Sequence, residues 1–330
     1  MAINITLRSI TRGCTLAAVI TLHAVPPAYA QTAYPSRPIR LIVPFPAGAG
    51  TDIVARTVGQ KLGEALGQPV IVENRGGAAG IVGTEMLAKS APDGHTLGLI
   101  TSSFAMSASL QKLPYDPIKD FIPLGTMASV QNILLVHPSL PVRNVQELIR
   151  LIRARPGQLT YATSGTGGVG HLTMELLRLK VSGLDVVQVP YKGNAPAVTD
   201  LIGGHVTMMF VALPSAKPYL APPRVRGLAV TSARRSQTVP DIPTMQEAGV
   251  PGYDYNSAFG LALPANTPRE IVVRLSNELL RILKLPDIRE RLTAAGTEPA
   301  GNLPEEYAAT IKADIVKWAQ VIRAAGIKAE

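Results

Sequence analysis

"YATSGTGGVGHLTMELL", residues 161–177, follows a short apolar run typical of a strand and opens a segment with helical spacing. Its Gly165-Thr166-Gly167-Gly168-Val169-Gly170 matches the G-x-G-x-x-G pattern of dinucleotide-binding loops. At such a junction the first helix amides lack internal partners, and glycine lets a ligand approach them closely. The stretch therefore predicts an α/β unit whose loop holds an anion.

A nicotinamide or flavin dinucleotide does not fit this loop. Asp185 lies 20 residues beyond Gly165, which is the spacing of a ribose-binding acid. However, Asp185 is the first residue of the predicted strand and therefore lies at its amino end, whereas the ribose-binding acid belongs at the carboxyl end. The carboxyl end carries Pro190-Tyr191-Lys192-Gly193 instead and offers no acid.

The first thirty residues have the pattern of a secretory signal peptide. Arg8 and Arg12 precede an apolar run, and Ala28-Tyr29-Ala30 supplies a small-x-small cleavage site. We expect residues 1–30 to be cleaved after Ala30 and the mature protein to be periplasmic. Cys14, the only cysteine, lies in this segment, so the mature chain has no disulfide, thiolate nucleophile or cysteine-bound metal.

Composition indicates a compact two-lobed protein. Apolar residues make up 46% and charged residues 17% of the chain. About 300 mature residues exceed the usual size of one hydrophobic core. The formal charge is +9, or +7 without Arg8 and Arg12, but basic residues are scattered and aromatic content is only 5%, which argues against nucleic-acid binding.

Predicted strands alternate with predicted helices along the chain, a pattern typical of mostly parallel α/β sheets. The predicted strands are residues 39–44, 70–73, 96–101, 159–163, 185–189, 206–211 and 225–231. The predicted helices are residues 51–66, 81–89, 169–180, 195–202 and 303–325. We interpret the extended stretches 121–137 and 253–263 as crossings between two lobes. We expect the first lobe to comprise residues 31–130 with 256–330, and the second lobe to comprise residues 131–255.

Two helix starts carry capping signals. Thr267-Pro268-Arg269-Glu270 reads as a capping box with proline at the first helical position. Asn144-x-x-Glu147 reads as a similar start for a helix that opens the second lobe.

Two glycine loops, one per predicted lobe, are the main chemical signal. The first is Val43-Pro-Phe-Pro-Ala-Gly-Ala-Gly-Thr-Asp52, and the second is Thr163-Ser-Gly-Thr-Gly-Gly-Val-Gly170. Both should lie at the carboxyl ends of strands, where α/β sheets bind ligands, with the positive ends of helix dipoles beside them. Together they predict a clamp around a small anion; plain tight turns remain the alternative.

The sequence gives little support to the hypothesis that the protein is an enzyme. Ser164 and His171 are the one pair that imitates a nucleophile and its base, which leaves a periplasmic hydrolase as an alternative. His171 is better explained as a capping or packing residue on the first helical turn. The sequence has no G-x-S-x-G elbow and no H-E-x-x-H cluster, so we expect no catalytic residues, no metal and no cofactor.

Five colinear stretches resemble the Bug family, the periplasmic receptors of the tripartite tricarboxylate transporter type. They are RPIRLIVPFPAGAGTDIVAR, VIVENRGGAAGIVGTEMLAKSAPDGHTLGL, LPYDPIKDFIPL, YATSGTGGVGHLTMELL and VPYKGNAPAVTDLIGGHVTMMF. The resemblance implies a two-lobed Venus-flytrap receptor without catalytic activity, for a di- or tricarboxylate or an aromatic acid. It also implies delivery to membrane transporter subunits or signalling through a sensor kinase. We expect a monomer that binds no nucleic acid.

The resemblance also implies which residues bind the ligand. They are Phe45, Ala47, Gly48, Ala49, Thr51, Asp52, Ser164, Gly165, Thr166, Gly167, Gly168, Tyr191, Lys192 and Gly193. We expect Asp52 to cap its helix or accept from a ligand hydroxyl or amine, because two anions repel. Asn132 and Ser102-Ser103 are further candidates.

Four positions depart from the family pattern. Ala49 stands where glycine is common, and Gly168 where a hydroxyl is common. Thr207 and Val211 replace acids, which we interpret as lost negative charge near the cleft and a change in ligand preference.

Overall fold

The computed structural model describes Met1 and residues 34–165, 167–191, 193–220 and 224–327. Residues from Tyr34 onward form one compact unit. The signal peptide expected over residues 1–30 lies outside the described residues, apart from Met1. Of the helices that the structure describes, none is long and apolar enough to cross a membrane.

The first lobe is built on three parallel strands. β1 (Ile39–Val43) lies between β2 (Val70–Asn74) and β3 (Thr96–Thr101). Helices α1 (Gly50–Leu66) and α2 (Ile81–Ala88) follow β1 and β2, with the short helix η1 (Ala78–Gly80) between them. Val54, Val58 and Leu62 recur at helical spacing on α1 and bury one stripe against the sheet.

The second lobe repeats this plan. β5 (Thr160–Thr163) lies between parallel β6 (Val187–Pro190) and β7 (Met208–Ala212). Its helices are α4 (Val145–Ala154), α5 (Val169–Lys180), α6 (Asn194–Ile202) and α7 (Leu213–Leu220). The helix start predicted at Asn144 is confirmed, because its side chain accepts from the Glu147 amide at 2.9 Å.

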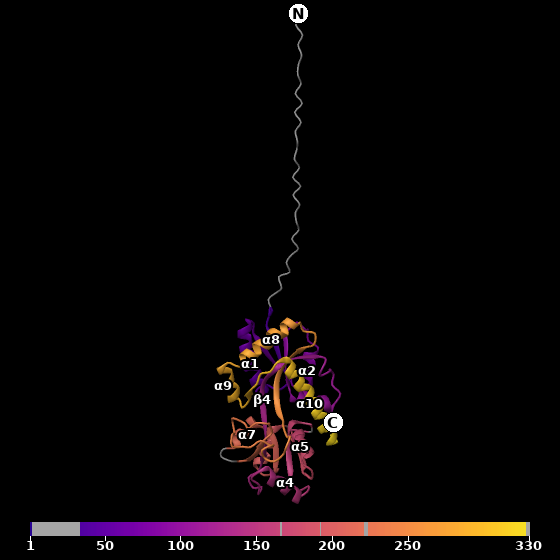
Figure 1. Ribbon diagram of the computed structural model, residues 1–330, viewed down its shortest axis with the longest axis vertical. Helices are drawn as coiled ribbons and strands as arrows, with labels where there is room; N and C mark the ends of the chain where they lie inside the picture. Colours follow the sequence, from indigo (N-terminus) through magenta and orange to yellow (C-terminus); the bar gives the residue numbers. More distant parts are fainter. Residues whose placement is uncertain (2–33, 166, 192, 221–223, 328–330) are drawn as a thin grey trace. The chain divides into compact units, whose positions relative to one another are not determined.

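Two long strands join the lobes (Figure 1). β4 (Phe121–Val136) pairs with β9 (Asn256–Pro264) and β10 (Glu298–Pro299) in the first sheet, and with β7 and β8 (Arg226–Val230) in the second. All of these pairings are antiparallel. The architecture is therefore two α/β lobes, each with a parallel set of strands, connected by crossing strands as the sequence predicted.

Three helices close the chain: α8 (Arg269–Ile282), α9 (Pro286–Ala294) and α10 (Pro304–Ala324). α10 lies against both lobes. Tyr307 and Ile311 near its start join a core of the first lobe, whereas Trp318 and Val321 join the main core of the second. α3 (Ser102–Leu110), which the sequence analysis missed, packs along α10 and contributes Met106 to that second core.

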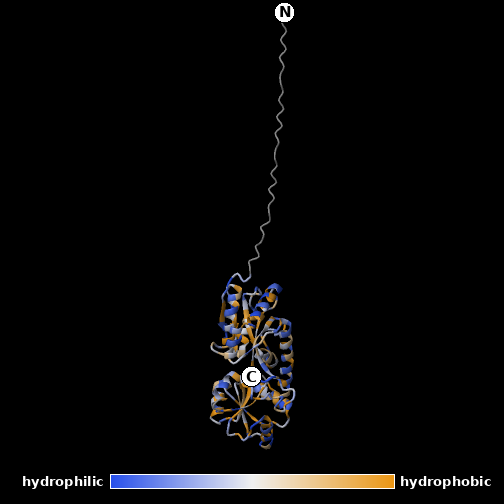
Figure 2. Cartoon of the chain, turned by 60° about the vertical axis from the view of Figure 1, so that its left-hand side comes forward, coloured by the Kyte–Doolittle hydropathy of each residue, from blue (hydrophilic) through white to orange (hydrophobic). Residues whose placement is uncertain are grey.

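Hydropathy explains why the strands and helices could be predicted from the sequence. In Figure 2 the strands carry most of the hydrophobic colour, and the outer helix faces are largely hydrophilic.

The predicted capping box at Thr267 is wrong. The helix begins at Arg269 with Pro268 at the N-cap, and the Thr267 hydroxyl instead donates to the Pro264 carbonyl at 2.8 Å. The tighter turn before the helix therefore uses the hydroxyl that the box requires.

Candidate functional site

The start of α1 leaves backbone amides open. Its N-cap residue, Ala49, is extended and has no side chain that can cap the helix. The amides of Asp52 and Ile53 donate to the Ala49 carbonyl at 2.9 and 3.1 Å. The preceding amides, of Gly50 and Thr51, have no partner among the described residues. They lie at the positive end of the helix dipole and can bind an anion.

Asp52 holds the first loop in shape. Its carboxylate accepts from the Gly48 amide at 2.9 Å and from the Asn74 side chain at 3.0 Å, and the Arg56 guanidinium lies 3.0 Å away. Burial alone would raise the pKa of Asp52, but the bonds from Arg56, Gly48 and Asn74, with the Arg56 charge, hold it below its usual value. The carboxylate is therefore ionised and already engaged within the protein.

The start of α5 is arranged in the same way. Its N-cap residue, Gly168, is extended and carries no capping side chain. The Gly168 amide donates to the Gly165 carbonyl at 3.3 Å, which closes the loop on itself. The next amides, of Val169 and Gly170, have no partner in the described part of the chain. Each of the two glycine loops thus leads into an uncapped helix start.

His171 shapes the second loop and is not paired with Ser164. Its Nδ1 accepts from the Gly167 amide at 3.0 Å, and its Nε2 lies 3.8 Å from Glu175. Burial, and then the charge of Arg178, lower the pKa of His171, so the ring is neutral and able to accept. No hydrogen bond joins Ser164 to His171, both of which the structure describes. The nucleophile–base alternative is wrong because the imidazole lone pair is committed to the loop.

A third strand end completes the wall between the loops. Thr101 caps α3 by accepting from the Ser103 amide at 3.3 Å. The Ser102 hydroxyl accepts from the Ala258 amide of β9 at 2.9 Å. This bond ties the start of α3 to a crossing strand, so the Ser102-Ser103 candidate lies where the lobes join.

These elements surround one cavity of about 180 Å³. Residues from both loops, from the start of α3 and from β9 line it: Phe45, Thr51, Thr101, Ser102, Ser103, Val169, Ser257 and Phe259. Thr51 and Val169 bring the starts of α1 and α5 to this cavity. The buried Thr51 hydroxyl has no partner in the described structure. A buried polar group left without a partner is costly, so this hydroxyl is available to a ligand or water.

The other predicted residues fall into four groups. Gly48, Gly165 and Gly193 lie beside open space, since a Cβ at any of them would meet no atom within 4 Å. Ala47 is exposed and does not line the cavity. Tyr191 donates its hydroxyl to Asp200 at 2.7 Å and does not line the cavity. Thr166 and Lys192 lie outside the described residues.

The sequence analysis missed four lining residues, among them Thr101, which was predicted only as the end of a strand. Val169 was seen only as a helix start, and its open amide follows from the uncapped Gly168. Ser257 and Phe259 belong to β9, which was predicted as a crossing strand. The alternation of side chains along that strand could have shown that they share a face, but not which face meets the loops.

The interpretation of Thr207 and Val211 as changes near the cleft is wrong. Thr207 immediately precedes β7, at the amino end of the sheet, where its hydroxyl accepts from the Thr160 amide and donates to the Thr160 carbonyl. Val211 is fully buried in a hydrophobic cluster of the second lobe. Neither lines the cavity. Thr207 lies at the amino end of β7, away from the ligand edge of a parallel sheet, and Val211 is packed in the hydrophobic cluster.

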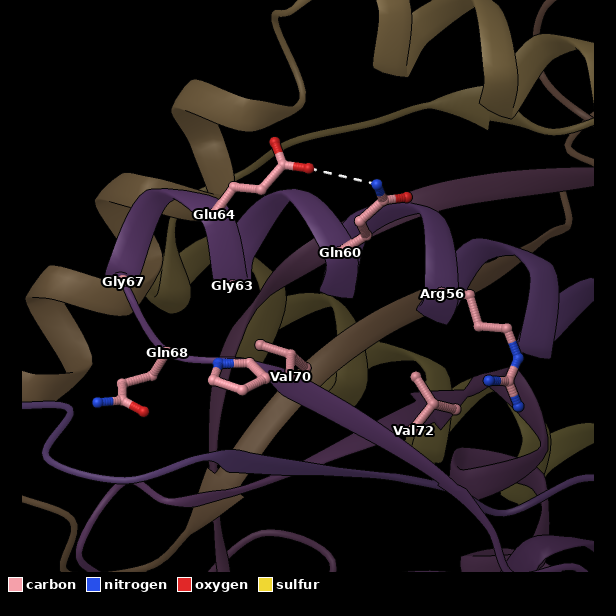
Figure 3. Close-up of a pocket in the computed structure, with 9 residues that line it drawn as sticks. Arg56, Gln60, Gly63, Glu64, Gly67, Gln68, Val70 and Val72 are labelled. Carbon is pink, nitrogen blue, oxygen red and sulfur yellow. Dashed lines mark hydrogen bonds between the residues drawn. The ribbon is translucent and has the colours of Figure 1, made fainter.

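A larger cavity, of about 600 Å³, lies on the outside of the first lobe (Figure 3). It is a groove between α1 and β2, an edge strand of the sheet. Three of its polar side chains bond to one another or to the first loop: Gln60 donates to Glu64 at 3.3 Å, and Arg56 contacts Asp52. The groove has no open helix start, so the smaller cavity between the loops is the better candidate for an anion site.

Comparisons with known proteins identify the family. Residues 54–327 match the family described as "Tripartite tricarboxylate transporter family receptor". The chain belongs to this family. It is therefore a periplasmic solute-binding receptor and not an enzyme, and the resemblance to Bug proteins is confirmed.

Relatives match over nearly their whole length. The chain is 36% identical to Protein BugT of Bordetella pertussis over 313 residues, 94% of this chain and 95% of BugT. It is 38% identical to a structure of R. palustris Rpa4515 with adipate, with a TM-score of 0.78 over 89% of this chain and 99% of the other. MatC of Rhodopseudomonas palustris with bound malate is 32% identical, with a TM-score of 0.74 over 88% and 100% of the two chains. The two-lobed periplasmic-binding-protein fold is thus confirmed.

Proposed function

We propose that this receptor captures a small organic carboxylate between its two lobes, with the open helix starts of α1 and α5 as the jaws. The observation that supports this most is that both uncapped starts reach one cavity, through Thr51 and Val169. The bound adipate and malate of the two related structures agree with this ligand class.

The physical basis is charge-assisted hydrogen bonding without a cationic side chain. Each helix start carries roughly half a positive charge on its free amides. A hydrogen bond to a charged group contributes about 1.5–3 kcal/mol. Two such bonds from each lobe, from Gly50 and Thr51 and from Val169 and Gly170, would hold a carboxylate and favour the lobe arrangement in which both jaws reach it.

In this proposal most of the other predicted residues hold the two loops in the conformation that exposes the amides. Asp52 fixes the first loop and His171 the second, Gly48 and Gly165 give the ligand room to reach the amides, and the missing side chain of Gly167 makes room for Leu110. Lobe 1 comprises residues 31–130 with 256–330 and lobe 2 comprises residues 131–255. The receptor works as a periplasmic monomer and presents its ligand to a membrane transporter of the tripartite tricarboxylate type.

A thermal-shift screen tests the ligand class. Mono-, di- and tricarboxylates, neutral sugars and amines are added to the mature protein, and the melting temperature is measured. A ligand at 100 times its dissociation constant adds about 2.7 kcal/mol to stability. We expect at least one carboxylate to raise the melting temperature. A shift with a sugar or an amine and with no carboxylate contradicts the proposal.

A further inference from the structure

Most of the hydroxyl groups that line the cavity already form hydrogen bonds within the protein. Thr101 and Ser103 hydrogen-bond to each other at 2.7 Å. Ser102 accepts from the Ala258 amide at 2.9 Å. These three residues make the wall polar in composition, yet their oxygens are largely occupied.

On the β9 side of the cavity the lining hydroxyl is also already hydrogen-bonded within the protein. The Ser257 hydroxyl accepts from the Asn132 side chain at 3.2 Å and hydrogen-bonds to Tyr255 at 2.9 Å. Asn132 was a ligand candidate from the sequence, but in the structure it positions Ser257. Of the five lining hydroxyls, only that of Thr51 has no protein partner in the described structure.

The open donors suffice for one carboxylate. An ionised carboxylate accepts about four hydrogen bonds. Among the described residues of the two loops and helix starts, the open donors are the Thr51 hydroxyl and the amides of Gly50, Thr51, Val169, Gly170 and His171. No lining residue that the structure describes is a lysine, arginine or histidine. A second carboxylate placed deep in the cavity would therefore lack a cationic partner among the described lining residues.

The rest of the wall is apolar. Phe45 reaches the cavity from the first loop, Phe259 from β9 and Val169 from the second lobe. All three side chains are half-buried, so a ligand body that covers them removes apolar surface from water on both sides.

We infer that this cleft selects a monocarboxylate with an apolar carbon body, aliphatic or aromatic, and rejects hydroxylated polycarboxylates. The inference rests on the proposed carboxylate function and specifies its ligand. The amides and Thr51 hold the single carboxylate, and Phe45, Phe259 and Val169 cover the body.

Isothermal titration of the mature wild-type protein with acetate, butanoate and hexanoate tests this directly. Each buried methylene raises affinity about fourfold, so two more methylenes raise it about 15-fold. We expect this rise along the series, and we expect 3-hydroxyhexanoate and citrate to bind at least about tenfold more weakly than hexanoate, because their extra polar groups lack partners.

A variant separates the two parts of the site. Phe259→Ala should weaken hexanoate binding about tenfold or more and change acetate binding by less than about threefold. Citrate or 3-hydroxyhexanoate binding more tightly than hexanoate, or equal affinity along the monocarboxylate series, overturns the inference but leaves the carboxylate function intact. Binding of no carboxylate at all overturns both.

Discussion

Ala49→Ser should make the protein more stable and a poorer receptor at the same time. Ala49 is the N-cap of α1, in the extended conformation that a capping residue requires, but it has no side-chain oxygen. A serine there can accept from the amide of Thr51 or Asp52. A capping hydroxyl in place of alanine contributes about 1 kcal/mol of stability. If it takes the Thr51 amide, the ligand loses one charge-assisted bond of about 1.5–3 kcal/mol, which is an affinity loss of about 10- to 150-fold.

Leu303→Ser is the matched control. Leu303 is the N-cap of α10, is half exposed, and lies outside the cavity, with Glu306 already accepting from its backbone amide at 2.9 Å. Serine there completes a capping box and should give a similar gain in stability with unchanged affinity. Urea denaturation measures the free energy of unfolding, and isothermal titration measures affinity. An Ala49→Ser protein that is stabilised and binds its carboxylate as tightly as the wild type refutes the role of the α1 start.

Three other changes test the loops. Gly167→Ala should cost about 1–2 kcal/mol of stability because Gly167 has φ +74°. It should also weaken ligand binding, since the new Cβ would lie 2.7 Å from Leu110 and displace the loop. The control Gly157→Ala (φ +69°) should cost similar stability and leave the affinity unchanged. Because the folded pKa of Asp52 is depressed, the stabilisation that its carboxylate gives is present above its ordinary pKa of 3.8 and is lost as pH falls through the folded value. Asp52→Asn should therefore make the free energy of unfolding fall less steeply at acid pH. An acid limb as steep as that of the wild type contradicts the assignment. His171 also has a depressed pKa, so the stability that its neutral ring gives the loop is present above about pH 6.5 and is lost at lower pH. Ligand binding by the wild type should therefore weaken from pH 7.5 to 5. His171→Asn, which does not titrate, should show a smaller pH dependence in calorimetric titration.

The fold was largely predictable because its signals are local. Runs such as Ile39–Val43 bury nearly every side chain, and their spacing from the following helices is regular. The capping error at Thr267 shows the limit, since one hydroxyl can serve either the helix or the turn before it.

The site was less predictable because its properties depend on partners distant in sequence or on loop closure. The glycine amides that attracted attention are partly used: that of Gly48 by Asp52 and that of Gly167 by His171. The open donors lie further on, at the helix starts. Phe259 joins the cavity only because β9 pairs with β3 and β4, which no local pattern reveals.

An amide-resolved NMR titration tests the central claim most directly. The mature protein, labelled with ¹⁵N, is titrated with a carboxylate that raises its melting temperature. We predict downfield amide-proton shifts at Gly50 and Thr51 in one lobe and at Val169 and Gly170 in the other, all following one dissociation constant. Shifts confined to one lobe, or centred on Gln60 and Glu64 in the outer groove, would contradict the two-jaw account.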